Sequence, residues 1–217
     1  MKIGMLGSGR VGRTIASRLV ELGHDVVVGA RDPDSPRAAG WAAEHPAGRA
    51  GAFRDAASHG EVVVNATAGT ASLAALAVAG SDSLAGKVLV DVANPLDFTR
   101  GSGRGPLAVT NDDSLAEQIQ RAYPAVRVVK ALNTVTADVM VRPELLPGPH
   151  TLFMAGDEPA AKQVVVGLLG ELGWPAGDIL DLGGIQAARG MEMYLPLWLS
   201  MMGALGTTIF NVHLVRS

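Results

Sequence analysis

The apolar positions of this chain form short continuous runs that alternate with amphipathic segments. Residues 1–6 form the first run, and Val11, Ile15, Leu19 and Leu22 follow at i, i+4, i+8 and i+11. A short apolar run is typical of a strand that is buried on both faces, and the second spacing places apolar side chains on one face of a helix. The chain therefore begins with a predicted strand and a predicted helix.

The same alternation continues to about residue 183. Further strands are predicted at residues 25–28, 50–53, 61–66, 87–92, 126–130, 150–154 and 179–182, and further helices at 35–45, 55–59, 71–79, 114–123 and 157–172. Asp112 or Asp113 is the predicted cap of the helix at 114–123. Alternating strands and helices predict an α/β fold, a Rossmann-type doubly wound, mostly parallel sheet. We expect one such domain over residues 1–183 and a C-terminal helical extension over residues 184–217.

The C-terminal segment is unusually apolar. Residues 193–215 are 23 residues without Asp, Glu, Lys or Arg, which is long enough to cross a bilayer. Pro196, Gly203, Asn211 and His213 interrupt the segment, and no basic cluster flanks it. We therefore predict an apolar helix, running from about residue 184 through the remainder of the chain, that packs on the core or on a second subunit as a homodimer contact; a membrane span is the alternative.

Composition narrows the classes of protein that remain. The net charge is −3 and there is no basic run, so nothing favours nucleic acid as a partner. The absence of cysteine excludes disulfides, thiolate metal sites and cysteine nucleophiles. The first strand begins without a charged region or a cleavage site, which predicts a cytoplasmic protein without a membrane partner.

A glycine-rich turn joins the first strand to the first helix. Its spacing, GxGxxG, lets a strand turn tightly into a helix and brings backbone N–H groups close to a pyrophosphate. We predict that this turn binds a dinucleotide through Gly7, Ser8, Gly9, Arg10, Val11 and Gly12.

The end of the second strand indicates which dinucleotide is bound. An NAD site carries Asp or Glu there to hold the ribose 2′-hydroxyl, whereas this chain has Gly29, Ala30 and then Arg31. A cation suits a 2′-phosphate, so we predict NADP(H), with Ala30, Arg31 and Ser35 at the phosphate and Arg37 close to them. The alternative for Arg31 is a solvated cation in the turn that follows it.

The reacting end of the cofactor is predicted at the carboxyl ends of the later strands, where ligands of open α/β sheets bind. The predicted cofactor contacts there are Ala66, Thr67, Ala68, Asn94, Pro95 and Asn133. Asn94 and Asn133 are the candidates for the catalytic end, beside the nicotinamide; ordinary turn chemistry is the alternative reading of both. The Gly/Pro-rich excursion at residues 94–110, which carries Arg100 and Arg104, is predicted to be a solvated loop, with a mobile flap as the alternative.

Groups for other kinds of chemistry are missing from these strand ends. None of the five histidines follows a strand, and no Ser-His-Asp order, HExxH motif or carboxylate pair lies near them, so no metal site is predicted. Lys130 and Tyr194 are the candidate proton donors, and we predict a structural role for both. Hydride transfer between two cofactor rings requires positioning and no strong acid, which favours that reaction.

Four stretches of the chain resemble the NADPH:coenzyme F420 oxidoreductase family, whose relatives include the cytosolic domain of six-transmembrane metalloreductases. They are the turn at 7–12 and residues 28–31, 128–134 and 153–157, and the segment 187–196 is also similar. The resemblance implies a dimeric, dinucleotide-binding protein with the 2′-phosphate among Ser8, Ala30, Arg31 and Ser35. It places the deazaflavin beside Leu132, Asn133 and Val135. Members that act on the deazaflavin often have His where this chain has Asn133, and bulkier residues where it has Ala68-Gly69, so the chain departs from their pattern at both places.

The predicted function is hydride transfer between NADPH and the deazaflavin coenzyme F420, catalysed by an NADP-dependent oxidoreductase. These two departures from the family pattern bear on the identity of the electron acceptor more than on the binding of NADP(H). A reductase of flavin, ferric iron or a small imine or carbonyl is therefore the first alternative. A non-catalytic redox sensor that binds NADP(H) is the second.

Overall fold

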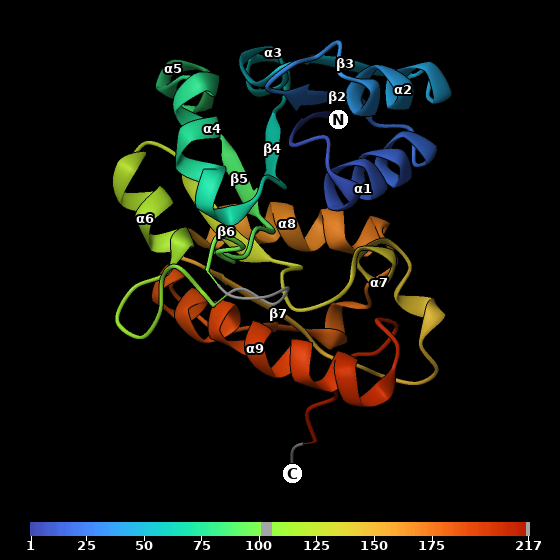
Figure 1. Ribbon diagram of the computed structural model, residues 1–217, viewed down its shortest axis with the longest axis vertical. Coiled ribbons are helices and arrows are strands. Elements are labelled where there is room, and N and C mark those ends of the chain that lie inside the picture. Colours follow the sequence, from blue (N-terminus) through green and yellow to red (C-terminus); the bar gives the residue numbers. More distant parts are fainter. Residues whose placement is uncertain (101–105, 216–217) are drawn as a thin grey trace.

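The computed structural model describes residues 1–100 and 106–215. Helices cover both faces of one eight-stranded sheet (Figure 1). The strands are β1 (Lys2–Leu6), β2 (Asp25–Ala30), β3 (Gly48–Ala52), β4 (Val62–Asn65), β5 (Val88–Asp91), β6 (Arg127–Ala131), β7 (Leu152–Gly156) and β8 (Ile179–Asp181). The helices are α1 (Arg10–Glu21), α2 (Pro36–Glu44), α3 (Phe53–His59), α4 (Ser72–Ala79), α5 (Ser81–Leu84), α6 (Leu115–Ala122), α7 (Ala137–Val141), α8 (Pro159–Glu171) and α9 (Ala188–Leu205).

The strand order confirms the predicted fold class. It is β3-β2-β1-β4-β5-β6-β7-β8, in which β1 to β6 are parallel, β7 is antiparallel to β6, and β8 is parallel to β7. The chain winds outward from β1 through β2 to β3 and then returns to place β4 on the other side of β1. The carboxyl ends of β1 and β4 therefore diverge into a crevice, which is where doubly wound folds bind their ligands.

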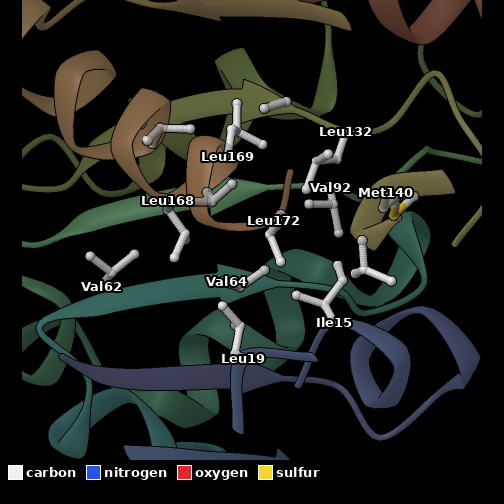
Figure 2. Packing of buried hydrophobic residues seen from close by; sticks show 14 of the residues in the cluster. Ile15, Leu19, Val62, Val64, Val92, Leu132, Met140, Leu168, Leu169 and Leu172 are labelled. Carbon is white, nitrogen blue, oxygen red and sulfur yellow. The ribbon is translucent and has the colours of Figure 1, made fainter. Parts of the chain in front are cut away.

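Apolar side chains fill both faces of the sheet. On one face Ile15 and Leu19 of α1 and Leu168 and Leu172 of α8 pack against strand residues such as Val64 (Figure 2). On the other face α3, α4 and α6 cover a second cluster. Of the four positions in the predicted spacing, Ile15 and Leu19 are buried, and Val11 and Leu22 are partly buried against the same cluster, so the periodicity identifies the correct face of this helix.

Two short helices and one helix cap differ from the prediction. The helices α5 and α7 span four and five residues, too short to give a periodic signal. The cap of α6 is Ser114, whose hydroxyl accepts a hydrogen bond from Glu117 N at 3.1 Å; the prediction of Asp112 or Asp113 is wrong. Asp113 instead binds Arg121 at 2.8 Å, and that bond lowers the pKa of Asp113 to about 2.

The apolar C-terminal segment is helical over only part of its length. The helix α9 ends at Leu205 because Gly206 adopts a left-handed conformation with φ 67°. The following residues are not helical and lie beside the start of β7, where Thr151 N donates to Val212 O at 2.8 Å. The prediction of a helix is correct up to Leu205 and wrong over residues 206–215; residues 216–217 lie outside the described residues. Within residues 1–100 and 106–215, no helix has the length and apolar character needed to cross a membrane.

Candidate functional site

A cleft of about 280 Å³ opens at the carboxyl ends of β4, β5 and β6. Seven residues predicted from the sequence line it: Arg10, Val11, Ala66, Thr67, Ala68, Asn94 and Asn133. The lining residues that our prediction of cofactor contacts left out are Gly69, Val92, Ala93, Leu96, Phe98, Val135, Thr136, Ala137, Met140, Leu195 and Trp198. Most of these additional lining residues come from three parts of the chain: the excursion after β5, residues 135–140 just before and within α7, and α9. The approach of these parts to the sheet depends on tertiary packing.

The glycine-rich turn leaves backbone donors uncovered at the start of α1. Gly9 caps the helix with extended backbone and supplies no side-chain hydrogen bond. Gly7 has φ 118° and donates from its N–H to Gly29 O at 2.9 Å, which ties the turn to β2. The first N–H groups of a helix have no intrahelical acceptor and carry partial positive charge. This turn is therefore suited to an anion such as a pyrophosphate.

Arg10 extends from this turn toward α7. Its guanidinium lies 2.7 Å from the carboxylate of Asp138 in the first turn of α7. Both side chains are exposed, at 67% and 39%, so the ion pair contributes little to stability and leaves Arg10 free to exchange partners.

The predicted 2′-phosphate residues lie at the end of β2, outside the lining of the cleft. Ala30 is buried, whereas Arg31 and Arg37 are exposed. Among the described residues neither arginine forms an ion pair, and Ser35 caps α2 without a hydrogen bond from its side chain. Three polar side chains near one strand end are thus available to an anion.

Asn94 and Asn133 hold each other at the floor of the cleft. Asn133 Nδ2 donates to Asn94 Oδ1 at 3.0 Å, and Asn94 Nδ2 donates to the Asn133 carbonyl at 2.8 Å. Asn133 Nδ2 also donates to Met191 O at 2.9 Å. Leu132 precedes this pair with φ 64°, a left-handed conformation that is strained for leucine and that sets the direction of Asn133.

The excursion after β5 begins and ends as a paired segment. Leu96 and Leu107 form an antiparallel bridge, and the carbonyl of Pro95 accepts from Ala108 N at 2.7 Å. Phe98 lines the cleft while 66% of the residue remains exposed. Residues 101–105, with Arg104, lie outside the described residues, so the choice between a loop and a flap stays a prediction.

A buried polar network supports the floor from beneath. Asn65 Nδ2 donates to Asp91 Oδ1 at 2.8 Å and to Ser72 Oγ at 3.0 Å. Thr67, which lines the cleft, donates from its hydroxyl to Asn65 Oδ1 at 2.7 Å. The network therefore fixes the end of β4 relative to β5.

Lys130 belongs to this network and does not line the cleft. Its ammonium is fully buried, 2.8 Å from Asp91 and 2.9 Å from Glu192, and it also donates to Ala93 O. Burial opposes the charge of Lys130, but the two carboxylates outweigh burial and raise its pKa. Lys130 is thus a buried cation within the fold. Tyr194 also lies outside the lining, and burial raises the pKa of its phenol.

The antiparallel strand β7 changes where one histidine lies. His150 precedes β7, so it reaches the same edge of the sheet as the carboxyl ends of the parallel strands. Its Nε2 interacts with Pro143 O at 3.1 Å and its Nδ1 with Asn211 at 3.0 Å, and it does not line the cleft. Among the described residues, no group of three or more histidines or carboxylates has the arrangement of a metal site.

The strand order, the glycine-rich turn and the cleft beside it are those of a dinucleotide-binding protein of the doubly wound α/β class. The family model for coenzyme F420-dependent NADP oxidoreductases matches residues 2–95. A crystal structure described as that of a candidate F420-dependent NADP reductase from Arthrobacter sp. FB24 is 49% identical in sequence. The structural alignment covers 100% of this chain and 100% of the Arthrobacter chain, with a TM-score of 0.94. The chain belongs to this family and is an NADP-dependent oxidoreductase.

Two curated proteins are similar over nearly the whole chain. The F420-dependent NADP reductase of Methanocaldococcus jannaschii is 26% identical over 93% of this chain and 92% of its own length. The metalloreductase STEAP3 of Rattus norvegicus is 36% identical over 91% of this chain, which spans 38% of the length of the rat protein. The names of these two relatives imply different electron acceptors, so the comparisons do not identify the electron acceptor of this chain.

Proposed function

We propose that the chain transfers hydride between NADPH and the deazaflavin coenzyme F420. The observation that carries this proposal is the chemistry of the cleft. Its polar lining side chains are Arg10, Thr67, Asn94, Asn133 and Thr136, and no Asp, Glu, Lys, His or Tyr is among the described lining residues. Reduction of a carbonyl needs an acid to protonate the alkoxide, whereas ring-to-ring hydride transfer needs two rings held in contact.

Each predicted site residue has a place in this proposal. The turn Gly7–Gly12 holds the pyrophosphate, and Ala30, Arg31 and Ser35 hold the 2′-phosphate. Residues 66–68, Asn94 with Pro95, and Leu132 with Asn133 lie at the nicotinamide, where the deazaflavin supplies the hydride acceptor. Residues 1–183 bind the cofactor, and residues 184–217 add Leu195 and Trp198 to the wall of the cleft.

A reductase of flavin or ferric iron is the second candidate. The resemblance places the small pair Ala68-Gly69 and the amide of Asn133 where members that act on the deazaflavin often have bulkier residues and histidine. The rat metalloreductase is 36% identical to this chain over 205 residues. An imine or carbonyl reductase and a non-catalytic NADP(H) sensor remain the further candidates.

The deciding experiment measures NADPH oxidation at substoichiometric enzyme. Oxidised coenzyme F420, FMN, a ferric chelate and a cyclic imine are offered separately. We expect turnover with the deazaflavin alone. Turnover only with FMN or the chelate assigns the chain to flavin or iron reduction, and turnover only with the imine assigns it to imine reduction. Tight NADPH binding without turnover supports the sensor.

We also propose that the chain forms a homodimer through α9. Met193, Leu197 and Leu205 on this helix are exposed, with Leu197 at 56% and Leu205 at 59%. Exposed apolar side chains on one helix are typical of a protein interface.

Replacing Leu197 with aspartate is expected to weaken this dimer at least about tenfold, because a buried leucine contributes roughly 1.5–3 kcal/mol. The measurement is sedimentation velocity across a concentration series. Val78→Asp is the matched control, since Val78 on α4 is 59% exposed and lies away from α9. A monomeric wild-type chain, or equal weakening in both variants, would contradict the proposal.

A further inference from the structure

The first turn of α9 is held by a carboxylate that the cleft does not contact. Glu192 is 1% exposed, and its Oε1 lies 2.9 Å from the ammonium of Lys130. Its Oε2 accepts a hydrogen bond from Leu115 N at 2.8 Å, and Oε1 accepts one from Ala116 N at 3.2 Å. Both oxygens therefore face donors, as an ionised carboxylate requires. Glu192 joins α9 to β6 and to the N-terminus of α6.

The neighbouring residue of the same turn reaches the cleft floor. Met191 is buried, and its carbonyl accepts a hydrogen bond from Asn133 Nδ2 at 2.9 Å. The other hydrogen of that amide goes to Asn94 Oδ1 at 3.0 Å. These two acceptors, Met191 O and Asn94 Oδ1, fix the orientation of the Asn133 amide. If the amide were rotated by half a turn, its oxygen would lie against both of these oxygens and make no hydrogen bond.

We propose that Glu192 is a positioning residue for Asn133: it fixes the first turn of α9, so that the Met191 carbonyl holds the Asn133 amide in one orientation. Asn133 Oδ1 is then the remaining acceptor of that amide, and it is buried without a partner among the described residues. This inference rests on the proposed place of Asn133 at the reacting end.

The surrounding charges indicate which variant preserves the fold. Replacing Glu192 with glutamine leaves Lys130 paired with Asp91 at 2.8 Å, so no buried cation loses all its partners. Burial raises the pKa of Glu192, and glutamine keeps the length of this side chain while it removes the charge. The glutamine amide nitrogen, however, must face a donor, and that mismatch displaces the turn.

Glu117 supplies the matched control. It joins the same two helices, because Arg189 of α9 lies 2.7 Å from Glu117 of α6. Glu117 contacts neither Lys130 nor Met191 in the hydrogen bonds of the described residues. Glu117→Gln therefore loosens the contact between α6 and α9 at Arg189 and leaves the bonds of Glu192 to Lys130, Leu115 and Ala116 in place.

The test is hydrogen exchange of the Asn133 side-chain amide, followed by NMR and assigned with an Asn133→Asp sample. We expect at least about tenfold faster exchange in Glu192→Gln, because one hydrogen bond to the amide weakens, and no change in Glu117→Gln. Wild-type exchange in Glu192→Gln, or equal acceleration in both variants, would overturn the proposal. Glu192→Asp, which keeps the charge and loses reach, gives the same readout if the glutamine variant does not fold.

Kinetics separate this inference from the proposed function. If Asn133 lies at the reacting end, Glu192→Gln lowers kcat about tenfold and leaves KM for NADPH within about twofold. Faster amide exchange with unchanged kcat supports the positioning role and contradicts the proposed place of Asn133.

Discussion

Replacing Arg31 with alanine is expected to remove most of the preference for NADPH over NADH. A charge-assisted bond between arginine and phosphate contributes roughly 1.5–3 kcal/mol. The dissociation constant of NADH divided by that of NADPH should therefore fall by about 10–100-fold. The structure supports this expectation, because Arg31 is exposed at the end of β2 and forms no ion pair with another described residue. Its guanidinium is thus available to a 2′-phosphate.

The measurement is the dissociation constant of each reduced nucleotide, obtained by titration calorimetry. NADH affinity should stay the same in Arg31→Ala, because NADH has no 2′-phosphate, and only NADPH affinity should fall. Arg49→Ala is the control: Arg49 is also exposed, but it lies on β3 and binds Asp25 at 3.1 Å. An unchanged NADPH to NADH ratio in Arg31→Ala would show that another group reads the phosphate.

The sequence predicts most of this fold because buried parallel strands leave a direct signal. Val62, Val63 and Val64 are at most 4% exposed, and so are Val88, Leu89 and Val90. Helices cover both faces of these strands, so every side chain is apolar and the run is continuous. The glycine-rich turn gives an equally local signal, since its spacing follows from its own backbone.

The rest of the site depends on contacts between distant parts of the chain. Nothing near Lys130 indicates that Glu192 will pair with it, and nothing in the apolar C-terminal segment shows that Trp198 will line the cleft. The direction of β7 is also set by tertiary packing, and it moves His150 to the edge that the strand ends occupy. Local patterns therefore locate the floor of the cleft, whereas its wall and its support follow from packing.

Replacing Gly9 with alanine is expected to weaken NADPH binding strongly without unfolding the protein. A Cβ at Gly9 would meet no atom within 4 Å, and its φ of −71° is one that alanine adopts readily. The space beside Gly9 is therefore left open by the fold, and in our proposal the pyrophosphate occupies it. A methyl group there would separate the phosphate from the N–H groups of α1, with a loss of about 10–100-fold in affinity.

Gly12 gives the contrast that makes this prediction specific. A Cβ at Gly12 would lie 2.0 Å from the carbonyl oxygen of Gly7, so Gly12→Ala forces the turn and α1 apart. It should lower the free energy of unfolding by about 1–3 kcal/mol, as overpacking does, whereas Gly9→Ala should leave it near wild type. Urea denaturation and NADPH titration of both variants measure the two effects. Full NADPH affinity in a folded Gly9→Ala protein would mean that the pyrophosphate does not approach this turn, because a methyl group cannot share that space with a phosphate.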